Sequence, residues 1–236
     1  MKSMAELARW QKWACAYNWL GIPLMLIAMF WSSFNYQLLI MILMAFPLVG
    51  MFIVWRSNGS VGVDGPQVNS FHNTIVLGSS MAICSLGIRA VMDYHYLSIS
   101  PLWLPAASIA VVYWLVVLVV DREARKIGQV VVQFMFLAAY AASTVFLANC
   151  VFDMSPGEPN INIVIDKRTS SHVKGPPSYE LSVAPWKYSA ESSEISVLRA
   201  TYDQLKVGEP IEIIVKGGLF DAPWVAAVKK KSVEPM

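Results

Sequence analysis

The stretch "YDQLKVGEPIEIIVKGGLFDAPWV", residues 202–225, has the pattern of a strand and a turn from a small water-soluble β-domain. Ile211, Ile213 and Val215 occupy every second position, with Glu212 between the first two, so the apolar side chains point to one face of a strand. Glycine and proline flank this alternation on both sides, as turns require. The chain therefore ends in a β-domain with a core of its own.

The residues before this domain have the composition of a membrane protein. Hydrophobic residues make up 56% of the chain and charged residues 14%, against about 25% charged residues in ordinary soluble domains. The deficit is uneven, because residues 1–152 carry eight Lys/Arg and five Asp/Glu, whereas residues 153–236 carry ten and eleven. The two parts have net charges of +3 (8 − 5) and −1 (10 − 11), and neither has the concentrated positive charge of a nucleic-acid-binding protein.

Apolar segments of roughly 20 residues predict a bundle of five transmembrane helices. The segments cover about residues 14–33, 36–55, 74–92, 101–120 and 130–152. Before them, residues 1–13 place Trp10 and Trp13 at helical spacing among charged residues, which favours an amphipathic helix in the headgroup region. No small-residue cleavage site follows the first apolar segment, so we expect a retained signal anchor.

Basic residues predict the orientation of these spans. With five spans, the N-terminal leader, Arg56 and the segment "DREARKIGQ" (121–129) all fall on one side of the membrane, and the loops on the other side carry no Lys or Arg. By the positive-inside rule the basic side is the cytoplasm. We therefore expect a multi-pass protein of the bacterial inner (plasma) membrane, with the N-terminus inside and a periplasmic domain at residues 153–236.

The tail contains five candidate strands and predicts a small all-β domain. The strands cover residues 160–166, 179–186, 194–200, 210–217 and 223–228. Turn-forming sequences such as "KGPPS" and "KVGEP" separate them. Five short strands in about 75 residues favour a barrel or a sandwich.

The end of the chain resembles the ends of uncharacterised bacterial inner-membrane proteins with a small extracytoplasmic β-domain. A "Y-x-x-L-x-V-G" lead, a strand and a "G-x-x-G-x-P-W"-like ending recur there. The matching residues are Tyr202, Leu205, Val207, Gly208, Gly218, Pro223 and Trp224, and Asp221 takes the place of the second glycine. The resemblance covers about 25 residues and implies a β-domain, without an activity.

One ionisable residue lies inside a predicted span. Arg89 falls in the third span, and Asp93 follows four residues later on the same helical face, so the two are candidates for an intramembrane polar pair. Arg89 is also close enough to the outer end of its span for its long stem to reach the headgroups. Small residues of the same span, among them Gly78, Ser79 and Ser80, favour close helix packing over a polar path.

The tail offers aromatic side chains as a candidate surface for a protein partner. Tyr and Trp are favoured at protein interfaces, and Trp186, Tyr188, Phe220 and Trp224 are the candidates, although a small domain also needs such residues in its core. No G-x-S-x-G, H-E-x-x-H or P-loop pattern occurs, and no Cys or His pair has zinc spacing. We expect neither an enzyme nor a bound cofactor or metal.

The sequence thus favours a non-enzymatic integral membrane protein. We expect the bundle to anchor the periplasmic β-domain in the lipid bilayer for binding to a protein partner, as an accessory or assembly subunit or a toxin-immunity protein does. The alternative is a small transporter or channel subunit, for which a polar path through the bundle would be needed.

Overall fold

The computed structural model describes residues 4–30, 35–63, 74–120, 127–170 and 177–231. The chain forms two compact units. The first unit contains the helices α1 (Met4–Phe30), α2 (Tyr36–Ser57), α4 (Val76–Met92), α5 (Trp103–Val120) and α6 (Ile127–Val151). The second unit contains a six-stranded sheet and is formed by Met92–Pro101 together with Phe152–Met236. A helical membrane unit and a β-domain were both predicted from the sequence.

Four helices are long and apolar enough to cross a bilayer. They are Ala8–Phe30, Tyr36–Ser57, Ser100–Val120 and Val130–Val151. The apolar helix α4 has 17 residues, or about 25 Å at 1.5 Å per residue, which is shorter than a hydrocarbon core of about 30 Å. The fifth span therefore stays a prediction, as does the orientation. Part of the basic segment behind that orientation, residues 121–126, lies outside the described residues.

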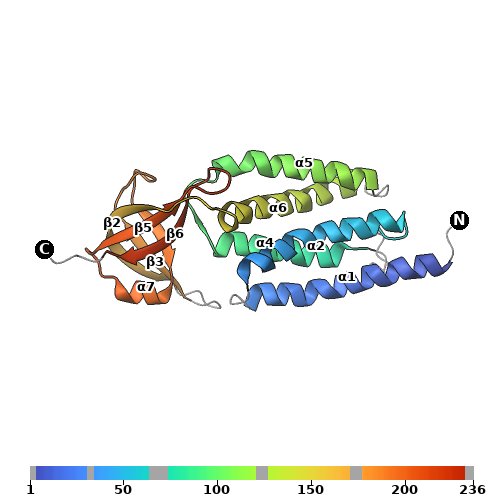
Figure 1. Ribbon diagram of the computed structural model, residues 1–236, viewed down its shortest axis with the longest axis horizontal. Coiled ribbons are helices and arrows are strands. Elements are labelled where there is room, and N and C mark those ends of the chain that lie inside the picture. Colours follow the sequence, from blue (N-terminus) through green and yellow to red (C-terminus); the bar gives the residue numbers. More distant parts are fainter. Residues whose placement is uncertain (1–3, 31–34, 64–73, 121–126, 171–176, 232–236) are drawn as a thin grey trace. The chain divides into compact units, whose positions relative to one another are not determined.

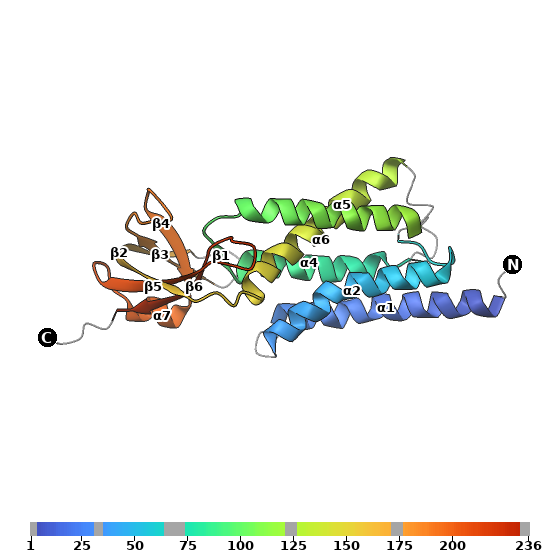
Figure 2. The same ribbon diagram turned by 45° about the horizontal axis from the view of Figure 1, so that its top comes forward.

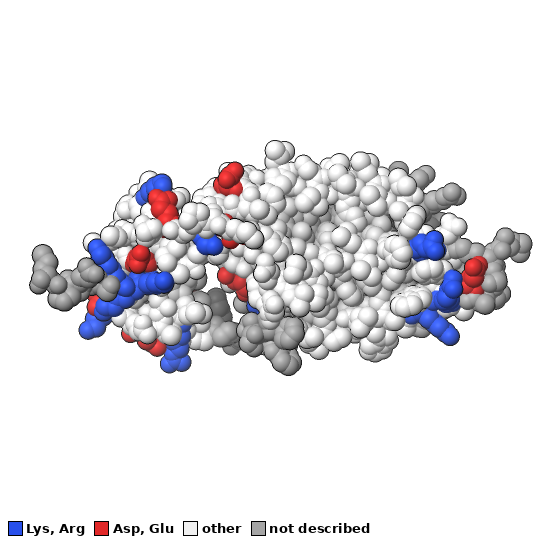
Figure 3. All heavy atoms as spheres, in the orientation of Figure 1, with Lys and Arg blue, Asp and Glu red and all other residues white. Residues whose placement is uncertain are grey.

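Over the residues that the structure describes, the surface of the helical unit carries few charges. Large apolar side chains such as Leu20, Phe30 and Leu104 project from the helices and are more than half exposed. Figure 3 shows a broad uncharged face over the helices, with Lys and Arg gathered at the end where α1 begins. A soluble protein rarely exposes so large an apolar area, so lipid is the natural surrounding of this unit. The amphipathic N-terminal segment continues into the first span without a break, as one helix.

Glycine allows three of the helices to approach closely. The Tyr17 ring of α1 lies against Gly50 of α2 and Gly78 of α4, and a Cβ atom at either glycine would lie 2.7 Å from the tyrosine side chain. A Cβ at Gly21 would likewise lie 2.7 Å from the Cα of Gly78. The helix packing predicted from small residues of the third span is confirmed at Gly78. In lipid, such close contact replaces the hydrophobic effect as the main attraction between helices.

The second unit is a nearly barrel-shaped antiparallel sheet (Figure 1 and Figure 2). Its strands follow the order β1-β6-β5-β2-β3-β4. Their bounds are β1 His95–Tyr96, β2 Glu158–Ser170, β3 Ser178–Val183, β4 Ser193–Val197, β5 Pro210–Lys216 and β6 Trp224–Lys230. A short helix, α7 (Arg199–Gln204), follows β4 where the sequence predicted a strand up to residue 200. That part of the strand prediction is wrong.

The predicted alternation of β5 is confirmed. Ile211, Ile213 and Val215 are buried, together with Val164 of β2 and Leu181 of β3. Each such side chain stabilises the fold by roughly 1.5–3 kcal/mol on burial, so this core holds the sheet together without disulfides. The three cysteines of the chain are all free.

The strand β1 was not predicted and comes from the connection between α4 and α5. His95 pairs with Val225 and Tyr96 with Trp224, and the N–H of Leu97 donates to the carbonyl of Pro223. Residues from the connection and from the C-terminal tail thus share one sheet. Both segments must therefore lie on the same side of the membrane, which agrees with α5 and α6 crossing as a pair.

Candidate functional site

Polar side chains in the helical unit gather around Pro47, which interrupts α2. Proline has no N–H, so the carbonyl of Leu43, four residues before it, loses its usual donor within the helix. Three tyrosine hydroxyls from three other helices donate to carbonyls at residues 44 to 47, in the same part of α2. The donors are Tyr17, Tyr113 and Tyr140, and the acceptors are the oxygens of Phe46 (3.1 Å), Pro47 (3.1 Å) and Met44 (2.5 Å), respectively. These hydroxyls therefore stabilise the interrupted helix rather than form an open polar path.

Asn18 performs a similar task at the start of α4. Its side-chain nitrogen donates to the carbonyl of Thr74 (2.8 Å), and its oxygen accepts from the N–H of Gly78 (2.9 Å). Because the first N–H groups of a helix have no partner within the helix, Asn18 supplies a cap from a neighbouring helix. No local sequence signal marks this role, since donor and acceptor are about 60 residues apart in the chain.

A cavity of about 80 Å³ lies inside the helical unit, between α2, α4, α5 and α6. Its lining is almost entirely apolar, with Ser79, Ser80 and Gln133 among the polar exceptions. Gln133 is only 6% exposed, and neither its Oε1 nor its Nε2 has a hydrogen-bond partner among the described residues. This buried amide was not expected as a site residue, because the sequence places it near the end of a span, where contact with water would account for it.

Arg89 is used to cap a helix. Its guanidinium donates to the carbonyl of Ala28 through Nε (2.7 Å) and Nη2, in the last turn of α1. It also lies over the ring of Tyr36, 6.0 Å from the centroid. A positive charge at a helix C-terminus is favourable, so Arg89 joins α4 to α1. Asp93 lies beyond the end of α4, in the second unit, and the Arg89–Asp93 pair stays a prediction.

The four predicted partner-binding aromatics are all half-buried in the β-domain. Trp186 donates through Nε1 to Ser193 Oγ (3.0 Å) and meets Tyr188 edge to face at 5.1 Å. Both pack against the core of the sheet. Phe220 lies in the β5–β6 connection. The aromatic surface stays a prediction, since these rings also fill the domain.

Trp224 belongs to a cluster around Asp153, which the sequence did not reveal. The Asp153 carboxylate accepts from the N–H groups of Ser155 (2.7 Å) and Gly218 (2.9 Å) and from Trp224 Nε1 (2.8 Å). The ring of Trp224 meets Tyr94 edge to face at 5.3 Å. Burial by itself would raise the pKa of Asp153, but these hydrogen bonds outweigh it and lower the pKa. The cluster fixes the start of the tail to the β5–β6 hairpin.

The β5–β6 turn itself requires left-handed backbone. Gly218 has φ +82° and Asp221 has φ +57°. Aspartate is one of the few residues besides glycine that adopt this conformation readily. This explains how Asp221 stands where the resembling sequences have a second glycine.

The outer face of β2 carries three exposed isoleucines, which we call the isoleucine row. Ile161, Ile163 and Ile165 are 63%, 49% and 46% exposed, whereas Asn162 and Val164 between them are buried. The alternation places the three on one face, away from the core. The row is not accounted for by the packing of the described domain.

A polar network begins where the isoleucine row ends. The register of β2 against β3 shifts between Val164 and Asp166, so a β-bulge moves Lys167 to the core side of the strand. Its Nζ donates to the carbonyls of Tyr202 and Leu205, both 2.6 Å away, at the C-terminal end of α7.

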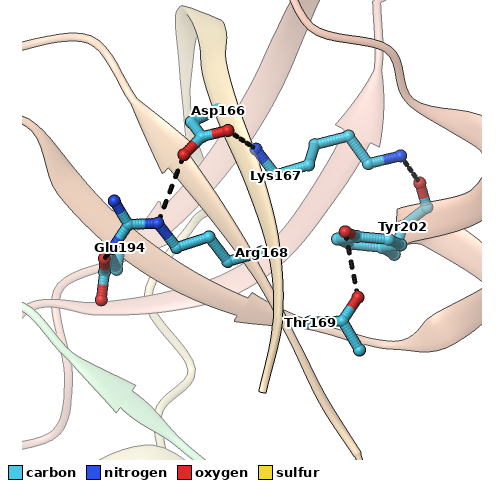
Figure 4. A network of polar contacts seen from close by, with 6 residues as sticks. All are labelled: Asp166, Lys167, Arg168, Thr169, Glu194 and Tyr202. Carbon is cyan, nitrogen blue, oxygen red and sulfur yellow. Dashed lines mark hydrogen bonds and ion pairs between the residues drawn. The ribbon is translucent and has the colours of Figure 1, made fainter. Parts of the chain in front are cut away.

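The outward side chains beyond the bulge are charged (Figure 4). Arg168 lies between Asp166 (3.3 Å) and Glu194 (3.2 Å) in two exposed ion pairs. Thr169 donates to the Tyr202 hydroxyl (3.1 Å). Exposed ion pairs contribute only about 0–1 kcal/mol each, so this end of β2 forms a polar border more than a source of stability.

Among the residues that the structure describes, no group of three His, Cys, Asp or Glu side chains is placed to hold a metal ion. Comparisons of the chain with protein-family models, with curated proteins and with solved structures give no match.

Proposed function

We propose that this protein is a non-enzymatic membrane protein that presents its β-domain to a protein partner. The observation that supports the proposal is the isoleucine row. Three large apolar side chains on the outer face of one strand, on a domain that already has a complete core, are characteristic of a binding surface.

The surroundings of the row favour a protein over lipid. Glu212 is paired in register with Ile161, and the ion pairs of Asp166 and Arg168 follow Ile165. An apolar centre with a charged border is the usual composition of a protein–protein interface.

The row also lies on a rigid support. The strand β2 is hydrogen-bonded to β5 along one part of its length and to β3 along the other. Little conformational freedom is lost when a partner binds such a surface, and the partner must contact side chains because the backbone groups are already paired.

In this proposal the helices hold the domain at the bacterial inner membrane with its sheet in the periplasm. The basic residues Arg9, Lys12 and Arg56 at one end of the helical unit support the orientation through the positive-inside rule. A toxin-immunity protein is the special case in which the partner is a toxin that acts on the membrane or in the periplasm. Expression of the chain would then protect cells from that toxin.

The alternative, a transporter or channel subunit, needs a polar path across the bundle. The hydroxyls of Tyr17, Tyr113 and Tyr140 and the side chain of Asn18 are bonded to backbone groups, so these polar groups are used for packing. This arrangement favours the anchoring function.

The test is site-specific photocrosslinking in native membranes. A photoreactive residue at Ile163 should capture one defined protein, and the same protein should be captured from Ile161. Ser196 is the matched control, because it is an exposed residue on β4 of the same sheet and is polar. Purified partner should bind the detergent-solubilised protein, and Ile163→Asp should weaken that binding at least tenfold. Equal capture from Ser196, or crosslinks to lipid alone, would contradict the proposal.

A further inference from the structure

The cavity of the helical unit contains a buried amide with unused hydrogen-bonding capacity. Gln133 lines the cavity, and both polar atoms of its side chain are buried without a partner among the described residues. The hydroxyl of Ser79 on α4 is bonded to Tyr17, and that of Tyr113 on α5 donates to Pro47. These two neighbouring hydroxyls are therefore already in use, and Gln133 is a buried polar group of the lining that a ligand would satisfy.

An unpartnered amide in an apolar interior is costly. Removing such a group from water without a new hydrogen bond is unfavourable. A molecule that offers one acceptor and one donor side by side removes the whole cost, because Nε2 donates to its acceptor and Oε1 accepts from its donor. Uncharged carboxylic acids and primary amides have this arrangement, whereas esters supply only the acceptor.

The size and lining of the cavity indicate an apolar remainder of the ligand. A volume of about 80 Å³ holds a carboxyl group and the first methylenes of a chain, since one water needs about 10–15 Å³ of such volume. Val132 and Phe136 line the cavity and are also about half exposed on the outside of α6. A chain can leave the cavity past these two side chains and lie along the helix in the lipid.

The depth of the site suits an amphiphile. Gln133 is three residues inside the span Val130–Val151, or about 4.5 Å from that end at 1.5 Å per residue. A single-chain lipid has its polar head at this depth and its tail in the hydrocarbon. Lateral entry from the bilayer then needs no aqueous route.

We propose that the cavity around Gln133 binds the head of a single-chain lipid that carries an uncharged carboxylic acid or primary amide. Gln133 forms two hydrogen bonds with the head, and Val132 and Phe136 border the chain. The site is separate from the proposed partner surface on β2.

The experiment uses the full-length protein in detergent micelles, with thermal unfolding as the readout. Palmitamide, and palmitic acid at a pH low enough to keep its carboxyl group protonated, should raise Tm, because both bind the folded state. Methyl palmitate, which lacks the donor, should give a much smaller rise at the same concentration. A diacyl phospholipid tests whether chains alone are sufficient.

Gln133→Leu separates binding from folding. Leucine is apolar and of similar volume, so the variant should unfold at the same Tm or higher without ligand and should bind palmitic acid at least tenfold more weakly. Val131→Leu, on the lipid-exposed face of the same helix, is the matched control and should respond as the wild type does. A photoreactive palmitic acid should label residues around Gln133 in the wild type and not in Gln133→Leu.

Three outcomes would overturn the proposal. One is an equal rise in Tm for acid and methyl ester. Another is an equal rise for wild type and Gln133→Leu. The third is no rise with any lipid, which would leave water as the partner of the amide.

Discussion

Asp153→Asn is the sharpest test of how the start of the tail is held to the β-domain. The carboxylate accepts three hydrogen bonds, from Ser155, Gly218 and Trp224. Asparagine keeps one oxygen, so at least one bond is lost and an NH₂ group then faces an N–H donor. Hydrogen bonds to a charged group contribute about 1.5–3 kcal/mol each, against about 0.5–1.5 kcal/mol for neutral pairs.

The expected loss of local stability follows from these magnitudes. One lost bond and two weakened bonds sum to about 4–6 kcal/mol, and partial exposure of Asp153 reduces this to about 2–3 kcal/mol. Such a loss should increase the hydrogen-exchange rate of the protected amides by a factor of roughly 30 or more. Hydrogen–deuterium exchange of the full-length protein in detergent measures it directly in peptides that contain Gly218 and Trp224.

Asp166→Asn is the matched control, because Asp166 forms an exposed ion pair with Arg168 and accepts a hydrogen bond from the N–H of the adjacent Lys167, and both contacts are far in sequence from Gly218. It should change exchange at Gly218 less than twofold. The reasoning is refuted if Asp153→Asn behaves as this control does. The pH dependence gives a second check. Because folding lowers the pKa of Asp153 below its ordinary value of 3.8, its contribution is complete above that pH and is lost as the pH falls through the lowered pKa.

Three further predictions concern other contacts. Gly78→Ala should destabilise the detergent-solubilised protein by about 1–3 kcal/mol and so lower its Tm, because the new Cβ would overlap an aromatic ring of α1. Gly87→Ala on the same helix is the control. A Cβ there would have its nearest neighbour at 3.5 Å, so Tm should stay within about 1 °C of the wild type. Burial lowers the pKa of His95 below its ordinary value of 6.5, so the unfolded state binds the proton more readily than the folded state. The free energy of unfolding should therefore fall as the pH drops below about 6.5. His95→Gln should remove this dependence on pH in a series of unfolding curves. Arg89→Leu should lower Tm through loss of the cap on Ala28, and Arg89→Lys should restore only part of it; an unchanged Tm for the leucine variant would contradict the capping function.

Patterns with a short period were readable from the sequence. The alternation at Ile211, Ile213 and Val215 and the apolar runs of α2, α5 and α6 each repeat within a few residues, so the sequence predicts the element and its buried face. Elements that are too short to show a repeating pattern were not predicted. The strand β1 has two residues, too few for a period, and exists only because β6 offers an edge to it. The helix α7 has six residues and no side-chain cap at Leu198, so nothing local distinguishes it from the end of β4.

Site residues were harder to predict because they depend on distant partners. In the sequence, Asp153 is simply an acidic residue that follows an apolar span. Its hydrogen-bond partners Gly218 and Trp224 come about 65 and 70 residues later in the chain, so only the folded structure brings them together. Gln133 stands alone in an apolar run, and its significance comes from a cavity that four helices enclose. The isoleucine row could have been noticed, since three isoleucines at alternate positions follow "EPN"; the sequence does not say which face of that strand is buried.

The pairing of β1 with β6 also sets an order for biosynthesis. Tyr96 and its partner Trp224 are 128 residues apart (224 − 96), so a ribosome that adds 5–20 residues per second needs roughly 6–26 s to make the second after the first. During that interval α5 and α6 are inserted while the short strand has no neighbour. The sheet can close only when synthesis is nearly complete, and a chain that stops before residue 224 would leave β1 unpaired. A quality-control protease would then have an exposed segment to recognise, on the same side of the membrane as the unfinished domain.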